Sequence, residues 1–550
     1  MKSISIFLKS IIRQRNIVAL CILLVCIASQ RMQSAAWNSG IIEFARVSVG
    51  VLMAVIIMTH YKWESIRAYK LPYIIWGICG LIAGVIITPI VITKLAAYKA
   101  AAAVLSAIGI YLIGFCVIYT IINIWKNGYR PKLYKPLFIV WVVMLLLMIF
   151  SRTEYWWPES YFFIFISYYL TERTSGQRLN VMKGLIDGMI LGFIAIQGHA
   201  LLCRPYDMVR YMGNFCNPNH NCMFLCMCLA AILAKLLFLT AEKGKLIFRI
   251  FYFGLAGVCY SLICMTICRS GYLATFVVTI FFLIAYCFVR RKKVFVRMGL
   301  LLVAIFIVML PTTYYAVRYI PTIHPHVVFY YQEPYSEQKV HSWDERNSEK
   351  FVSFEHMLQT VFGRIISTRK AYEDLGNKEV SMEIRELPAV KIAAAEGYIP
   401  KVALTMLLAE EAEEKKIPAL TDVEASNAFT VRYTIYKWYI DHLSLRGMPF
   451  DEQGFQMTED HWIQDTHNIY LDYGINFGIP VMILFIVFIW WGIGRLVRHG
   501  CKERDVVKLS CLMIALIPPV FGLFEYSWGT GMISTVAFYM AFSEMFRLDK

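Results

Sequence analysis

Several short polar segments of the sequence hold side chains suited to binding a phosphate group or moving a proton. The first, residues 210–221, contains Arg210, Asn217 and Asn219 around Gly213 and Pro218, which favour a tight turn. Asn side chains in such a place cap the start of a helix, and the N–H groups of a helix start attract anions. The segment therefore predicts either an ordinary helix cap or an anion-binding site.

Two further arginines are candidates to bind an anion. Arg269 lies between two long apolar stretches with almost no linker, and Arg432 lies in a polar segment next to aromatic residues. A guanidinium presents a planar fork that matches two oxygens of a diphosphate. The alternatives are that Arg269 reaches lipid headgroups and that Arg432 is a solvated or paired surface residue.

The last segment, residues 465–474, contains His467, Asn468, Tyr470 and Asp472. Histidine is the side chain that ordinarily changes charge near neutral pH. His467 is therefore a candidate to deprotonate an attacking hydroxyl or to bind a phosphate, with Asn468, Tyr470 and Asp472 as candidate substrate contacts. The plainer interpretation is an interfacial helix cap.

The composition indicates what positions these residues. Apolar residues make up 58% of the chain and charged residues 17%, with a mean hydropathy of +0.56. A soluble protein is about half apolar and about a quarter charged. The apolar residues form blocks of about 20, the length of a helix that crosses a bilayer. The blocks are 16–32, 41–59, 71–92, 103–125, 136–150, 158–170, 181–202, 219–239, 248–268, 272–289, 298–315, 469–491, 509–524 and 532–546.

These blocks predict an all-α, polytopic membrane bundle of about 12–14 transmembrane helices, because in lipid a helix satisfies its own backbone hydrogen bonds. The fifth and sixth blocks are short, so twelve or thirteen spans are possible. The predicted organisation is a bundle in residues 1–315, a loop domain in 316–467 and three final helices in 468–550. The loop has helix-forming composition at 391–396, 402–416 and 427–443.

Lys and Arg are concentrated in alternate connecting segments. This pattern predicts cytoplasmic termini and an extracytoplasmic loop at 316–467. Anionic headgroups account for the net charge of +16 without a nucleic-acid partner. None of the 15 cysteines falls in the loop, so no disulfide scaffold is expected there. No metal-ligand spacing occurs at the outer face, and we expect neither a metal nor a cofactor.

Taken together and in this order, the segments resemble the O-antigen ligase and O-antigen polymerase superfamily of bacterial membrane glycosyltransferases. The matching features are the Gly-x-Phe-x-Asn-Pro-Asn-like turn at 213–219, the Arg-Ser-Gly junction at 269–271, the Arg432 region with Trp438 and the turn 445–447, the His-Asn-x-Tyr-Leu run at 467–471 and the Gly-Ile-Pro at 478–480. The resemblance covers residues 210–480; the earlier spans match only in hydropathy. Together and in this order, these motifs are more specific than any one of them.

The resemblance implies a fold like that of class C glycosyltransferases and the transfer of a glycan from a polyprenyl diphosphate carrier to an acceptor outside the cytoplasm. The acceptor would be a glycan, lipid, protein or wall polymer. Arg269 and Arg432 would hold the diphosphate, with Arg210 a further candidate, and His467 would assist the acceptor hydroxyl or the departing diphosphate. Asn217 and Asn219 would shape the site.

The sequence departs from the family pattern at Cys268, where a Ser is usual before the Arg, and at Arg446, where an apolar residue is common before the Gly. The segment 319–427 is long and matches no part of the pattern, which leaves the acceptor open. Two other functions compete: a transporter or flippase of lipid-linked glycans, and a noncatalytic membrane scaffold. A flippase places charges inside the bundle along a path, whereas here Lys and Arg gather at the membrane faces and Asp187 is one of few intramembrane acids.

Overall fold

The structure is a computed structural model of the chain. It describes residues 13–29, 39–94, 97–153, 157–203, 210–215, 217–241, 246–290, 294–323, 354, 357–358, 360–361, 428–458, 461–463, 466–525 and 532–547. The predicted helices at 391–396 and 402–416 lie outside the described residues.

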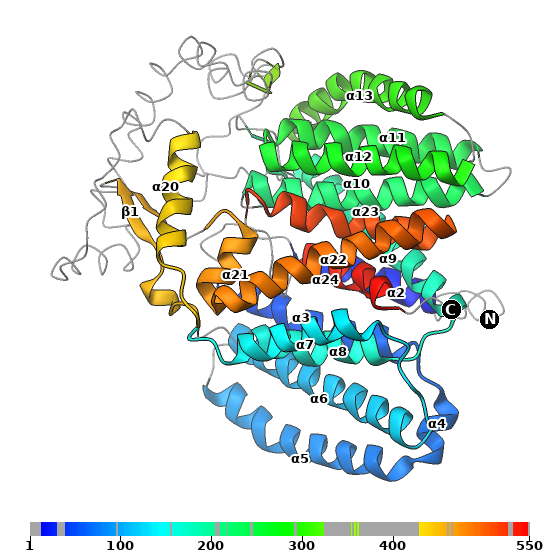
Figure 1. Cartoon of the computed structure of the whole chain (residues 1–550), viewed down its shortest axis with the longest axis vertical. Helices are drawn as coiled ribbons and strands as arrows, with labels where there is room; N and C mark the ends of the chain where they lie inside the picture. Colours follow the sequence, from blue (N-terminus) through cyan, green and yellow to red (C-terminus); the bar gives the residue numbers. More distant parts are fainter. Residues whose placement is uncertain are drawn as a thin grey trace. The chain divides into compact units, whose positions relative to one another are not determined.

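The described residues are mainly helical (Figure 1). The helices before the long loop are α2 (Gln14–Ala28), α3 (Ser39–Met58), α4 (Trp63–Ala68), α5 (Lys70–Lys94), α6 (Ala97–Trp125), α7 (Lys135–Ile149), α8 (Trp157–Leu170), α9 (Ser175–Cys203), α10 (Pro218–Ala241), α11 (Leu246–Met265), α12 (Arg269–Arg290) and α13 (Phe295–Ile323). The later elements are α20 (Ala428–Asp441), η3 (Phe450–Glu452), β1 (Phe455–Thr458), β2 (His461–Ile463), α21 (Ile469–Phe477), α22 (Ile479–Glu503), α23 (Val506–Phe521), α24 (Ile533–Phe542) and η4 (Ser543–Phe546).

Each apolar block of the sequence coincides with helix in the structure. Within the described residues, seven helices (α6, α9–α13 and α22) are long and apolar enough to cross a bilayer, and six shorter apolar helices accompany them. This supports a helical, multi-pass membrane protein. The helices α7 and α8 have only 15 and 14 residues, about 22 Å, less than the roughly 30 Å of a hydrocarbon core.

The block 469–491 was predicted as one span, and that prediction is wrong. It forms two helices, α21 and α22, which are separated at Gly478. Gly478 has φ +98°, in the region that only glycine adopts readily. Hydropathy is continuous across this break, so an apolar pattern cannot reveal it. At the other boundary of the loop, α13 continues to Ile323, past the predicted end of the bundle at residue 315.

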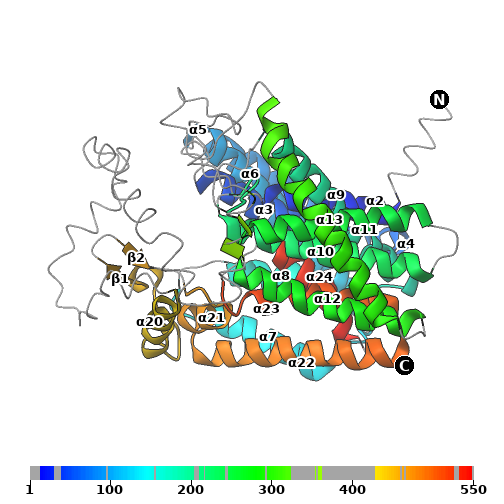
Figure 2. The ribbon, with the colours of Figure 1, turned by 90° about the horizontal axis from the view of Figure 1, so that it is seen from above.

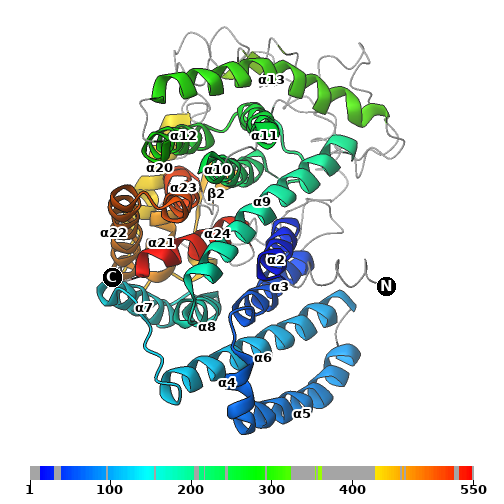
Figure 3. The same ribbon diagram turned by 90° about the vertical axis from the view of Figure 1, so that its right-hand side faces the viewer.

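The core of the bundle is built around α10 and α23. The helix α10 contacts α9, α11, α12, α23 and α24, and Figure 3 shows it enclosed by these neighbours. Every residue from 221 to 234 on α10 and from 508 to 521 on α23 is buried. The long helix α22 packs against α7 and α23 (Figure 2). Helices so enclosed form a rigid support for the polar segments at their ends.

The outermost helices turn apolar side chains outward. On α5, Leu81 and Val85 are 71% and 73% exposed; on α13, Val296 and Leu300 are 72% and 65% exposed. Large exposed apolar surfaces of this kind are unfavourable in water and favourable in hydrocarbon. These faces are therefore the ones expected to contact lipid.

The helix α9 approaches α2 through three glycines spaced four residues apart. A Cβ on Gly184 would lie 2.6 Å from the Arg15 carbonyl oxygen, and one on Gly188 would lie 2.6 Å from the Ala19 carbonyl oxygen. A Cβ on Gly192, one turn further along, would lie 2.6 Å from the Cys26 Cβ. Small residues at this spacing allow two membrane helices to pack backbone to backbone. The glycines thus set the position of α2 on the bundle.

The chain divides into two compact units. One comprises Met1–Phe354, Tyr436–Gln453 and Asp465–Lys550; the other comprises Glu355–Ile435 and Gly454–Gln464. The described part of the second unit contains an antiparallel hairpin in which Phe455 pairs with Ile463 and Gln456 with Trp462. The sequence analysis did not predict these two strands. The helix α20 confirms the predicted helix near 427–443 and crosses from the second unit to the first.

Candidate functional site

The turn at residues 210–215 is bonded to the connection between α11 and α12. The Tyr211 backbone N–H donates to the Met265 carbonyl at 2.9 Å, and Arg210 Nε donates to the Thr266 carbonyl at 2.9 Å. A second nitrogen of Arg210 donates to Asn219 Oδ1 on α10. Arg210 is half-buried between these partners. The structure therefore brings the first two polar segments of the sequence into direct contact.

The start of α10 is an ordinary helix cap. Asn217 Oδ1 accepts a hydrogen bond from the Asn219 backbone N–H at 2.8 Å, and Pro218 follows as the first helical residue. This is the standard chemistry of a helix start, since proline has no N–H to leave unsatisfied there. Asn217 and Asn219 thus have structural roles, the cap and the contact to Arg210, and any contact with substrate stays a prediction.

A buried polar network lies below this turn. Gln197 on α9 accepts from the Tyr211 hydroxyl at 2.9 Å and donates to Asn221 Oδ1 at 3.3 Å, while Asn214 Nδ2 donates to the Ile196 carbonyl at 3.1 Å. Within the described residues, Asn214 Oδ1 and Asn221 Nδ2 are buried without a hydrogen-bond partner. Sequence reasoning missed Gln197 because it lies in an apolar block. The sequence alone does not show that Gln197 lies under the turn.

The α11–α12 connection is strained. Ile267 has φ +50°, and a β-branched residue rarely adopts this conformation, which costs about 1–3 kcal/mol. The next residue but one, Arg269, begins α12 and is exposed. Gly271 packs so closely on α10 that a Cβ there would overlap Cys222 Sγ. The junction holds the Arg269 backbone tightly against the buried helix α10 and leaves its side chain at the surface.

His467 lies at the start of α21, beside a carboxylate that the sequence analysis did not identify. Its Nδ1 is 3.4 Å from Glu525 Oε2, and the two side chains are 34% and 9% exposed. His467 has φ +49°, so the backbone is strained at this residue too. Strained residues of this kind are concentrated at functional sites. Glu525 lies one residue beyond the apolar block 509–524, and nothing in the sequence around it indicates that it pairs with His467.

Asn468 holds the strained His467 segment in place. Its Oδ1 accepts from the backbone N–H groups of Tyr470 and Leu471 at 2.9 and 3.2 Å, and its Nδ2 donates to the Leu523 carbonyl at 3.0 Å. One side chain thus caps α21 and ties it to the segment that carries Glu525. Asn468 thus has a structural role, and its contact with substrate stays a prediction.

Tyr470 and Asp472 complete the first turns of α21. The Tyr470 side chain is nearly buried, and its hydroxyl donates to the Pro519 carbonyl at 3.1 Å. Asp472 is half-buried, and its backbone carbonyl accepts from Asn476 Nδ2 at 2.9 Å. Tyr470 therefore anchors α21 on α23. A contact of either residue with substrate stays a prediction.

Two lines of contact extend this centre. The Tyr436 hydroxyl on α20 lies 3.2 Å from the His467 carbonyl and 3.3 Å from the Leu523 carbonyl. A hydrogen bond to Cys222 and burial raise the pKa of the Cys268 thiol well above its usual value, and the negative charge of Glu525 contributes. The His467 centre and the Arg269 junction both belong to the first unit.

The turn 445–447 docks into the break between α21 and α22. The Ile479 N–H donates to the Ser444 carbonyl at 2.9 Å, and the Met448 N–H donates to the Ile475 carbonyl at 2.7 Å. Gly447 and Gly478 both have positive φ, and a Cβ on Gly478 would overlap the Leu445 backbone. The two motifs at 445–447 and 478–480 therefore form a single interlocked structure.

Arg432 belongs to the second unit, while Tyr436, one helical turn later on α20, belongs to the first. The Arg432 side chain is half-buried. That Arg432 joins Arg269 at a diphosphate stays a prediction. Among the described residues, no group of three or more His, Cys, Asp and Glu side chains is arranged to hold a metal ion.

Comparison of the chain with models of protein families, with curated proteins and with solved structures finds no match. The motifs and the geometry of the His467–Glu525 pair, Arg210 and Arg269 are therefore the features that bear on function. A histidine bonded to a carboxylate is oriented for proton transfer, and nearby guanidinium groups can stabilise an anion.

Proposed function

We propose that the chain is a membrane glycosyltransferase that transfers a glycan from a polyprenyl diphosphate carrier to an acceptor hydroxyl outside the cytoplasm, as a ligase or polymerase of cell-surface polysaccharide. The observation that carries the proposal is the clustering of polar segments that are distant in sequence. The turn that carries Arg210 is hydrogen-bonded to the α11–α12 connection that precedes Arg269, and His467 is paired with Glu525, 58 positions later in the chain.

The proposed reaction moves one proton and one glycosyl group. The acceptor hydroxyl gives its proton to His467 Nε2 as its oxygen bonds to the anomeric carbon of the glycan. The bond from that carbon to the diphosphate oxygen breaks, and the polyprenyl diphosphate leaves with the bonding electrons. Glu525 at Nδ1 stabilises the resulting imidazolium, as the carboxylate of a catalytic triad does. Arg269, with Arg210 as a further candidate, neutralises the charge on the leaving diphosphate. The family resemblance implies the same role for Arg432, which stays a prediction.

The break at Gly478 is the one observation that favours a transporter, because transporters bind substrates at discontinuous helices. Those breaks lie at the middle of the membrane. Here α22 has 25 residues after the break, about 37 Å, which crosses a hydrocarbon core without α21. Asp187, one of the few intramembrane acids, is paired with two cations. Both features count against a transporter.

The test is transfer by the purified full-length protein in lipid, with a polyprenyl-diphosphate-linked glycan and labelled acceptors, in the presence of EDTA. We expect wild type to release glycan from the carrier, and His467→Ala, Arg269→Ala and Arg432→Ala to lose activity by about 100-fold or more. The labelled product identifies the acceptor class and distinguishes a ligase from a polymerase.

The structure provides a matched control. His499 and Glu503 form another histidine–glutamate pair, with 3.7 Å between Nδ1 and Oε1, at the far end of α22. His499→Ala should retain wild-type transfer and thermal stability. If wild type transfers nothing to any acceptor class, or if His467→Ala is as active as His499→Ala, the proposal fails.

A further inference from the structure

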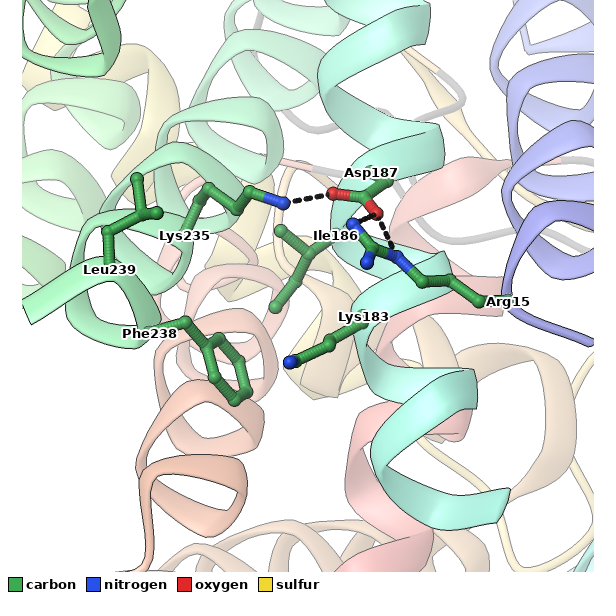
Figure 4. A pocket seen from close by; sticks show the side chains of 7 residues that line it. All are labelled: Arg15, Lys183, Ile186, Asp187, Lys235, Phe238 and Leu239. Carbon is green, nitrogen blue, oxygen red and sulfur yellow. Dashed lines mark hydrogen bonds and ion pairs between the residues drawn. The ribbon is translucent and has the colours of Figure 1, made fainter. Parts of the chain in front are cut away.

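A small charged cavity lies between α2, α9 and α10, outside the site described above. It has a volume of about 70 Å³, room for a group larger than one water molecule. Its lining consists of Arg15, Lys183, Ile186, Asp187, Lys235, Phe238 and Leu239 (Figure 4). Three of these side chains are cationic and one is anionic.

The single carboxylate is shared between two of the cations. Asp187 Oδ2 accepts from Arg15 Nε at 2.6 Å, and Asp187 Oδ1 accepts from Lys235 Nζ at 2.6 Å. Lys183 adds a third positive charge, with its Nζ 5.6 Å from the centre of the Phe238 ring. The cavity therefore carries two more positive than negative charges. The Lys235 and Asp187 side chains are 16% and 18% exposed, whereas Arg15 is 41% exposed, so the cationic lining reaches the surface at Arg15.

This cavity is at the opposite end of α10 from the candidate transferase site. Asn219, which contacts Arg210, and Lys235 are sixteen positions apart on α10, which is about 24 Å along the helix. That distance is most of the thickness of the hydrocarbon core. The cavity is thus expected at the other face of the membrane, which the charge pattern predicts to be cytoplasmic.

The start of α11 adjoins the cavity and has an apolar surface. Arg249 donates from Nε and Nη2 to the Leu239 carbonyl, at 3.1 and 2.7 Å, and Lys235 Nζ lies 5.8 Å from the Tyr252 ring. The neighbouring Ile247 and Phe251 are 76% and 53% exposed. A cationic cavity next to outward-facing apolar side chains suits a ligand with an anionic head and an apolar tail.

We propose that this cavity binds the phosphate group of an anionic membrane lipid. The lipid phosphate would lie among Arg15, Lys183 and Lys235, and its acyl chains would lie along the apolar surface of α11. Asp187 holds Arg15 and Lys235 in position and lowers the net charge of the cavity. The site is independent of the transferase proposal, because it shares no residue with the His467 region.

The experiment measures lipid binding by the full-length protein with phosphatidylglycerol and phosphatidylcholine, by native mass spectrometry and by thermal unfolding. We expect phosphatidylglycerol to bind and to raise the unfolding temperature, and phosphatidylcholine to do neither. Lys183→Gln leaves both ion pairs of Asp187 intact and should weaken phosphatidylglycerol binding by about fivefold. Lys126→Gln is the matched control, because Lys126 also lies over an aromatic ring, that of Trp125, at 5.3 Å.

Asp187→Asn should change the stabilisation by phosphatidylglycerol in the opposite direction. It raises the positive charge of the cavity, so phosphatidylglycerol should stabilise this variant more than it stabilises wild type. Inorganic phosphate added to protein in phosphatidylcholine nanodiscs separates the two sources of the anion. If phosphate alone stabilises as strongly as phosphatidylglycerol, a soluble phosphate is the ligand and the lipid proposal is wrong. If Lys183→Gln binds phosphatidylglycerol as Lys126→Gln does, the cavity is not the site.

Discussion

Replacing Glu525 by Gln tests the role of the carboxylate beside His467. The substitution keeps the size of the side chain and an oxygen that can accept from His467 Nδ1, but it removes the negative charge 3.4 Å away. At that distance Coulomb's law gives about 1 kcal/mol in water and about 5 kcal/mol at an effective dielectric constant of about 20. With His467 34% exposed and Glu525 9% exposed, the stabilisation of an imidazolium should be about 2 kcal/mol, a roughly 30-fold fall in rate when it is lost.

The assay is steady-state glycan transfer together with thermal unfolding. Because Glu525 acts on the charge that His467 gains during the reaction, kcat should fall while KM for the carrier-linked glycan stays constant. Glu525→Asp restores the charge and should recover part of the rate. Glu503→Gln removes the carboxylate of the other histidine–glutamate pair and should leave kcat unchanged.

The reasoning is refuted if Glu525→Gln turns over within about threefold of wild type, a difference of less than about 1 kcal/mol. It is equally refuted if the rate falls only in parallel with the unfolding temperature, because Glu525 would then support the fold without acting on His467. A rise in KM with constant kcat would assign Glu525 to glycan binding instead.

Three other predictions concern the supports of the site. Gly478→Ala places a side chain at φ +98° and into backbone, so it should destabilise the protein by about 2–4 kcal/mol; Gly494→Ala, where the added Cβ meets open space, should lower the unfolding temperature little, and equal effects would contradict the prediction. Gly188→Leu should separate α2 from α9 and abolish the folded, monodisperse protein in size-exclusion chromatography, whereas Gly198→Leu on the same helix has room and should be tolerated. Cys268 should resist maleimide at pH 8 in the folded protein, because its thiol pKa is raised and little thiolate is present; labelling seen by mass spectrometry before unfolding would show that the thiol is accessible and ionised.

The positions of the helices could be predicted from the sequence because hydropathy reports directly on burial in lipid. The break at Gly478 could not, since its neighbours on both sides are apolar and the deciding property is a backbone angle. The turn at Gly447 that fills the break lies in a different part of the sequence. Its fit against α21 depends on backbone contacts that no local pattern encodes.

The candidate site was predictable in its cations and histidine but not in their partners. Arg210 and His467 are conspicuous as polar residues next to membrane helices. Their partners are a backbone carbonyl at Thr266 and a carboxylate at Glu525. A carbonyl has no sequence signature, and Glu525 is 58 positions from His467. Asp187 was likewise visible as an intramembrane acid, while its partner Arg15 was interpreted only as a charge that orients the chain.

The ion pair between Arg15 and Asp187 joins residues 172 positions apart. At a synthesis rate of about 5–20 residues per second, α2 emerges from the ribosome roughly 9–34 seconds before the helix that its backbone must contact. During that interval Arg15 has no Asp187, and the surface of α2 that will meet the glycines of α9 faces lipid or the insertion machinery. The helix α2 is therefore synthesised early but reaches its final contacts late. A delay in releasing the chain after α9, or a ribosomal pause within the intervening segment, would expose this helix longer and make it a preferred target for membrane quality-control proteases.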